Sequence, residues 1–307
     1  MWSAIDETGK LVYPNFVETV VRIVPMYWVR AIGGTLVFIS FLVMMYNLYK
    51  TAKSGSTNDE EVFEAYALDE SSVERNSTKH RKLEGMPTLF SVLSLIAILV
   101  GTGIELIPSI LSNNYIERMD VIQPYTPLEV IGRDIYVREG CYLCHSQTIR
   151  PMAHEVLRYG KVSEAAEFVY DRPFQWGSKR TGPDLHRVGG KYSNLWHYRH
   201  FRKPQEVTAG SIMPRYTWLF DSKIDYKTLV KKLTVLRKLG TPYEDEEIAT
   251  SVENAKEQAL SIAEDLEQTG GIPIEVQERE VIALIAYMQR LGIDYGSLEP
   301  EEDEEEE

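Results

Sequence analysis

The chain has 307 residues, of which 26% are charged and 44% are apolar, and its formal net charge is −13. These values are typical of a folded protein and exclude a collagen-like chain or a mostly disordered polymer. An acidic chain lacks the basic face that nucleic acid requires, so we expect no nucleic-acid partner. Its two cysteines are too few for a disulfide framework.

The first element is an uncharged stretch over residues 31–49, AIGGTLVFISFLVMMYNLY. As a helix it would be about 28 Å long, close to the roughly 30 Å thickness of a bilayer's hydrocarbon core. It is apolar on all faces, and aromatic and basic residues flank it. We therefore predict a transmembrane helix within residues 1–53; a buried core helix is the alternative.

A second uncharged stretch, residues 89–104, reads LFSVLSLIAILVGTGI and predicts an anchor helix over 86–112, again with a core helix as the alternative. The linker 54–85 between the two stretches is polar and carries lysines and an arginine close to the membrane. The positive-inside rule places it in the cytoplasm and the flanking segments outside. Residues 1–30 show no signal-peptide pattern, so we expect that helices once preceded this segment.

Residues 140–147 read GCYLCHSQ, a C-x-x-C-H pattern formed by Cys141, Cys144 and His145. This pattern is typical of covalent haem c attachment, with two thioether bonds and a histidine ligand to the iron. A zinc site would need further cysteine or histidine ligands at suitable spacing. A thioredoxin-like pair would need a βαβ pattern around it. The sequence therefore predicts one covalent haem c.

Two later segments resemble parts of class I cytochromes c. TGPDL, with Pro183, resembles the segment whose proline carbonyl holds the haem histidine, which implies that role for Pro183 toward His145. SIMP contains Met213, which we predict to be the second axial ligand. A second histidine remains the alternative. The remaining candidates are Met152, Met288, His154, His186, His197 and His200.

The rest of the chain is also helical in pattern. Residues 221–269 predict two helices broken near Gly240, and 278–291 predict an amphipathic closing helix. The tail 299–307 is almost wholly acidic and predicts a solvated, disordered end. We thus expect an all-α fold with two transmembrane helices and, over 113–298, a class I cytochrome c domain with extra helices.

The segments CYLCHSQTIRP, YDRPFQWGSKRTGPDL and SIMPRYTWLF together resemble the mono-haem cytochrome c subunit (CcoO/FixO type) of cbb3-type cytochrome c oxidases. The resemblance begins near residue 85. Residues 1–53 are similar to the last transmembrane helix of the catalytic subunit of the same oxidases. The chain therefore resembles the end of a fused catalytic-plus-cytochrome polypeptide.

This resemblance implies an electron-transfer subunit in a bacterial inner membrane, with its haem domain in the periplasm. Electrons would come from a dihaem cytochrome c subunit or a soluble cytochrome c. They would leave to the haem b and copper catalytic subunit, which reduces oxygen in a proton-pumping complex. Arg180, Trp196 and Tyr198 are candidates for packing on the porphyrin or for binding its propionates.

Other functions remain open from the sequence. A cytochrome c subunit of a nitric oxide reductase also combines an anchor with one C-x-x-C-H pattern, but the DRPFQWGSKRTGPDL run argues against it. A peroxidase would need an open iron site and hence a displaceable Met213. A structural assembly subunit is the fourth hypothesis.

Overall fold

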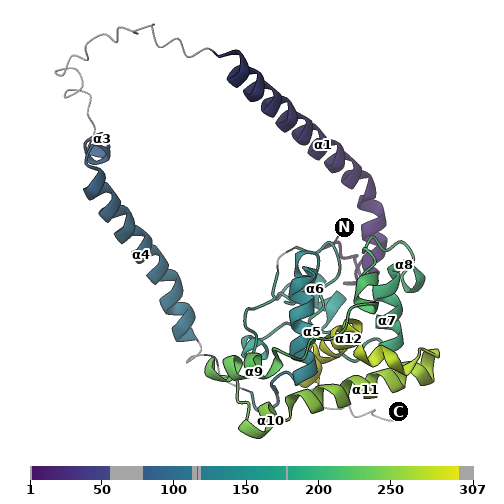
Figure 1. The fold of residues 1–307 in the computed structure, drawn as a ribbon. Coiled ribbons are helices and arrows are strands. Elements are labelled where there is room, and N and C mark those ends of the chain that lie inside the picture. Colours follow the sequence, from purple (N-terminus) through teal and green to yellow (C-terminus); the bar gives the residue numbers. More distant parts are fainter. Residues whose placement is uncertain (1, 56–78, 113–115, 117–118, 178, 297–307) are drawn as a thin grey trace, which may run out of the picture. The chain divides into compact units, whose positions relative to one another are not determined.

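The computed structural model describes residues 2–55, 79–112, 116, 119–177 and 179–296 (Figure 1). Within these ranges every regular element is helical, apart from two isolated β-bridges, so the all-α prediction is confirmed. The chain forms two compact units, one of residues 1–26 with 117–307 and one of 27–116. The helices are α1 (Phe16–Ser54), α3 (Lys79–Glu84), α4 (Pro87–Ser112), α5 (Pro127–Arg138), η1 (Cys141–Leu143), α6 (Ala153–Tyr159), η2 (Ala165–Phe168), α7 (Asn194–Arg202), α8 (Pro204–Val207), η3 (Thr217–Phe220), α9 (Leu229–Lys238), α10 (Asp245–Ala249), α11 (Ser251–Gly270), η4 (Ile274–Glu278), α12 (Glu280–Arg290) and α13 (Ile293–Gly296).

Helices α1 and α4 contain the two predicted membrane spans. Both are long and apolar enough to cross a membrane, and none of the residues in their most apolar windows is buried within the protein. Helix α1 has 39 residues, or about 58 Å at 1.5 Å per residue. This is longer than a hydrocarbon core of roughly 30 Å, so part of α1 extends beyond the membrane.

Other sequence predictions concern segments that are only partly described. Most of the predicted linker 54–85 lies outside the described residues, although α3 falls at its C-terminal end. The predicted acidic tail 299–307 also lies outside them. The proposed domain limits at residues 53, 85, 112 and 298 therefore stay predictions.

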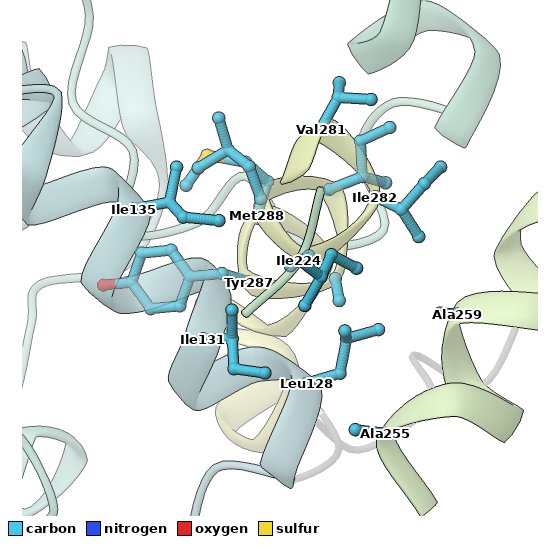
Figure 2. Packing of buried hydrophobic residues seen from close by; sticks show 14 of the residues in the cluster. Leu128, Ile131, Ile135, Ile224, Ala255, Ala259, Val281, Ile282, Tyr287 and Met288 are labelled. Carbon is cyan, nitrogen blue, oxygen red and sulfur yellow. The ribbon is translucent and has the colours of Figure 1, made fainter. Parts of the chain in front are cut away.

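The core of the cytochrome-like domain is the crossing of α5 and α12. Figure 2 shows α5 side chains facing α12, with α11 packed beside them. A Cβ atom on Gly132 of α5 would lie 1.9 Å from the carbonyl oxygen of Ala283 on α12. The two helix backbones can approach this closely only because residue 132 has no side chain. The apolar residues that fill the contact include Leu128, Ile131, Ile135, Ile282, Tyr287 and Met288.

Side-chain hydrogen bonds stabilise both ends of α5. Thr126 and Glu129 form a capping box at its N-terminus, which satisfies two otherwise unpaired backbone N–H groups. At the C-terminus, Arg138 donates to both carboxylate oxygens of Glu280 on α12, at 2.8 and 2.6 Å. A bidentate pair of this kind fixes direction as well as distance. Helix α5 therefore ends at a defined point, directly before the C-x-x-C-H pattern.

Residues 221–269, for which the sequence predicted two helices, contain three α-helices, α9, α10 and most of α11. Helix α9 ends before Gly240, whose φ of +101° favours glycine. The next segment begins as α10, through a capping box of Glu244 and Glu247. The long helix α11 then places alanines at every fourth position against the core. These small residues, Ala255, Ala259 and Ala263, are almost fully buried.

Candidate functional site

Helix α5 leads directly into the candidate site. The backbone N–H of Glu139 caps α5 by donating to Ile135 and Val137, and Gly140 turns the chain with a φ of +69°. The short helix η1 then carries Cys141. Cys141 and His145 are half-buried, whereas Cys144 is exposed. Burial raises the pKa of Cys141 to about 12, with a further contribution from the charge of Glu139.

The ring of His145 is held by a proline carbonyl. The Nδ1 atom of His145 lies 2.8 Å from the carbonyl oxygen of Pro183. Because a carbonyl only accepts, Nδ1 carries the proton and Nε2 keeps its lone pair. Burial also lowers the pKa of His145, against the raising effect of the Pro183 hydrogen bond. In the neutral ring, this hydrogen bond leaves Nε2 available as a metal ligand.

Gly182 makes room for that ring. A Cβ atom at residue 182 would lie 2.2 Å from Cε1 of His145 and 2.6 Å from Nε2. The backbone N–H of Gly182 also donates to the carbonyl of Cys144 at 2.9 Å. The loop that carries Pro183 therefore packs directly on the histidine ring, without an intervening side chain.

A buried polar network fastens this loop to the residues after His145. Asp184 accepts hydrogen bonds from the Ser146 hydroxyl at 2.6 Å and the Thr148 N–H at 2.9 Å. Arg180 donates to the same Ser146 hydroxyl at 2.6 Å and forms an ion pair with Glu155 of α6 at 2.6 Å. Arg180 is a candidate for packing on the porphyrin or for binding its propionates, and that role stays a prediction; its protein partners are these groups.

The segment that carries Met213 reaches the same region. Met213 is half-buried and, like Cys141, packs against the core. Burial raises the pKa of Tyr216 to about 12, with contributions from the charges of Cys141 and Cys144. Trp218 donates from Nε1 to the carboxylate of Glu139 at 2.9 Å. Residues 213–218 are therefore fastened against the attachment loop.

Helix α7 carries an aromatic stack. Trp196 is stacked between Tyr192, with ring centres 4.0 Å apart, and His200, at 4.5 Å. Burial lowers the pKa of His200 to about 4, with a contribution from the charge of His145. Of the candidate residues on α7, Trp196 therefore belongs to this aromatic stack. Tyr198 is buried against Phe220 of η3, at 4.9 Å.

Sequence reasoning did not single out Gly182, Tyr216 or the Arg180 network. Gly182 stands directly before Pro183, so the same TGPDL motif contained the signal. The Glu155–Arg180–Asp184 network joins residues far apart in the chain, and no spacing rule would find it. Sequence reasoning kept His200 only as an alternative axial ligand.

The residues present fit a covalently held haem. Two free cysteines and a neutral histidine lie in one turn of chain, and they are the donor set of a c-type attachment loop. Within the described residues, no cluster of three histidine, cysteine or acidic side chains could hold a metal ion by itself. The donor set therefore suits a haem iron with one histidine from the protein, rather than a zinc ion.

The architecture defines a class: a membrane-anchored protein with an all-helical, cytochrome c-like domain. A family model described as "Cytochrome C oxidase, mono-heme subunit/FixO" matches residues 80–295, and the chain belongs to this family. Membership of a mono-haem family implies one haem. The nitric oxide reductase alternative is not favoured by this match.

The N-terminal part is similar to a different subunit. The "Cytochrome c oxidase subunit 1 homolog, bacteroid" of Bradyrhizobium diazoefficiens is 46% identical over 55 residues, which cover 18% of this chain and 10% of the relative. The "Cbb3-type cytochrome c oxidase subunit CcoN1" of Stutzerimonas stutzeri is 43% identical over 54 residues, covering 18% and 11%. The chain thus spans about a tenth of the length of these curated relatives. The prediction of a fused catalytic-plus-cytochrome chain is supported by both matches.

Proposed function

We propose that this chain carries one covalent haem c, bound through Cys141 and Cys144 and ligated by His145. The observation that supports this most directly is the hydrogen bond from Nδ1 of His145 to the Pro183 carbonyl at 2.8 Å. A partner on Nδ1 fixes the tautomer and the ring plane and makes Nε2 a better ligand. Met213 is proposed as the second axial ligand.

The haem supplies one-electron storage when it is bound. The protein residues set the conditions for it. His145 is oriented by Pro183, and the half-buried Met213 offers a thioether, a weak neutral ligand that raises the potential of an iron centre. The buried network of Arg180 and Asp184 holds the Pro183 loop against the residues that follow His145. Trp196 and His200 supply a stacked aromatic surface on α7.

The proposed role is electron transfer within a cbb3-type oxidase. Electrons would enter from a dihaem subunit or a soluble cytochrome c and pass to the catalytic subunit, where oxygen is reduced. This proposal is supported by the family match over residues 80–295 and by the catalytic-subunit likeness of the N-terminal part. The membrane is proposed to be the bacterial inner membrane, with the haem domain on the periplasmic side.

The experiment that tests this proposal is haem detection after denaturation. Full-length protein is expressed in membranes, separated on a denaturing gel and stained for haem peroxidase activity. We expect the wild-type band to stain. Cys141→Ala and Cys144→Ala together should remove the stain, whereas Met213→Ala should keep it, because only the thioethers survive denaturation. An unstained wild-type band in a host that matures c-type cytochromes would contradict the proposal.

A further inference from the structure

The segment before the first membrane span is docked on the cytochrome-like domain. Residues 1–26 belong to the same compact unit as residues 117–307. Arg158 of α6 donates from Nη1 to the carbonyl of Pro14 at 3.0 Å and from Nη2 to the carbonyl of Trp2 at 3.3 Å. The Arg158 guanidinium therefore binds two backbone carbonyls of the N-terminal segment.

The first turns of α1 add an apolar contact. Val20 is 3% exposed and Thr19 is fully buried, although both lie on a helix that otherwise exposes its side chains. A Cβ atom on Gly210 would lie 2.9 Å from Cγ2 of Val21 and 3.3 Å from Cγ1 of Val17. The helix surface thus rests directly on the backbone of the loop after α8.

This docking surface is joined to the haem-type site through α6. Glu155 lies three residues before Arg158, on the next turn of the same helix, and is 1% exposed. Its carboxylate pairs with Arg180, and Arg180 donates to the hydroxyl of Ser146, the residue after His145. Helix α6 therefore carries both the arginine that binds the docked segment and the carboxylate that pairs with Arg180.

Helix α1 continues without interruption from this contact into the apolar span. From Val20 to the start of the uncharged stretch at Ala31, the helix rises about 16 Å at 1.5 Å per residue. The docking contact thus lies about 16 Å before the uncharged stretch begins, and Trp28 and Arg30, the expected interfacial residues, lie between the two.

We propose that the face formed by Arg158 and the Gly210 loop is a docking site for residues 2–26. The cytochrome-like domain is then attached twice: through α4 by the chain itself, and through this face to the end of α1. Because α1 resembles a helix of the catalytic subunit, the contact joins the cytochrome-like domain to the first turns of that helix. This last step rests on the proposed function; the contact itself does not.

Disulfide trapping in the full-length, membrane-embedded chain tests the contact. A protease site is placed within residues 56–78, so that cleavage separates α1 from the rest. The test pair is Val17→Cys with Gly210→Cys, and the matched control is Val29→Cys with Gly210→Cys. Residue 29 lies about 18 Å further along the helix by the same rise, which is too far for a disulfide.

After oxidation and cleavage, we expect the test pair to migrate as one band that separates on reduction, and the control pair to give two bands. Equal trapping in both pairs would overturn the proposal. So would no trapping in the test pair while its cytochrome-like domain unfolds at the wild-type temperature. Trapping needs no haem, so a failed haem assay and a failed docking contact are distinguishable.

A second measurement avoids substitution at Gly210, whose φ of +82° strains any other residue. Arg158→Gln removes the two hydrogen bonds to the N-terminal segment. We expect trypsin to cleave after Lys10 and Arg22 several-fold faster in this variant than in the wild type. Arg237→Gln, which removes an exposed ion pair with Asp245, is the control and should cleave at the wild-type rate. Unchanged cleavage in Arg158→Gln would overturn the docking site.

Discussion

The Nδ1 atom of His145 lies 2.8 Å from the carbonyl oxygen of Pro183, and Gly182 lies against the same ring. This arrangement orients the histidine, because its partner is a backbone group on a fastened loop. A carbonyl acceptor also leaves the other ring nitrogen unprotonated and free to bind iron.

Gly182→Ala tests this packing. The new methyl group would lie 2.2 Å from Cε1 of His145, so the ring or the loop has to move. We expect less covalent haem per protein and a changed ligand field in whatever haem is retained, measured by the absorption spectrum. Gly190→Ala is a demanding control. Gly190 has a φ of +70° and nothing within 4 Å of its Cβ position. If both variants behave alike, a general effect of replacing a glycine, and not contact with the His145 ring, explains the loss.

Met213→Ala tests the second axial ligand. Removing the thioether should lower the haem midpoint potential by on the order of 100 mV or more, within the wide range that axial ligands span. It should also abolish the charge-transfer absorption of a methionine-ligated ferric haem. Redox titration and the oxidised spectrum measure these effects. Met152→Ala, at an exposed position, should change neither. A normal potential in Met213→Ala would assign the ligand to another residue, with His200 the first to examine.

Arg180→Gln tests the network that fastens the two loops. Its loss leaves the carboxylate of Asp184 without its cation and that of Glu155 with Arg150 alone, and each of these side chains is 1% exposed. Breaking a buried pair by removing one partner costs about 3–5 kcal/mol, and we expect a loss of that order in the free energy of unfolding. Arg237→Gln removes the exposed partner of Asp245, and exposed pairs contribute about 0–1 kcal/mol. Chemical denaturation of the two variants compares them directly; similar losses would contradict a structural role for the Arg180 network.

The pH dependence of stability follows from the same carboxylate. Burial by itself would raise the pKa of Glu155, but hydrogen bonds from Arg180 and Arg150 outweigh it and lower the pKa to about 2. A depressed pKa stabilises the fold above the ordinary value of 4.5 and loses that contribution as pH falls from 4.5 toward 2. We expect Glu155→Gln to flatten this part of the stability profile, measured by thermal unfolding at stepped pH. An unchanged acid slope would assign it to other groups, of which Glu167, also with a pKa of about 2, is the next.

The sequence indicated those features that depend on residues close together in the chain. The C-x-x-C-H pattern, the TGPDL segment and the two long apolar stretches each lie within a few residues of the elements that the structure contains. The roles of Arg180 and Tyr198 were less accessible. The structure adds their protein partners, an ion network for Arg180 and the core for Tyr198, and their role toward a haem stays a prediction.

The sequence by itself determined the helical class, the two membrane-crossing helices and the attachment loop with its histidine. These features depend on apolar runs and on fixed spacing between residues close together in the chain, so they can be recognised without the tertiary structure. Only the tertiary structure decided that Gly132 lets α5 touch α12, that Arg180 joins α6 to the residue after His145, and that Arg158 holds the segment before the first span. Those contacts join residues far apart in the chain. Their energy comes from burial and pairing that exist only once the helices have packed.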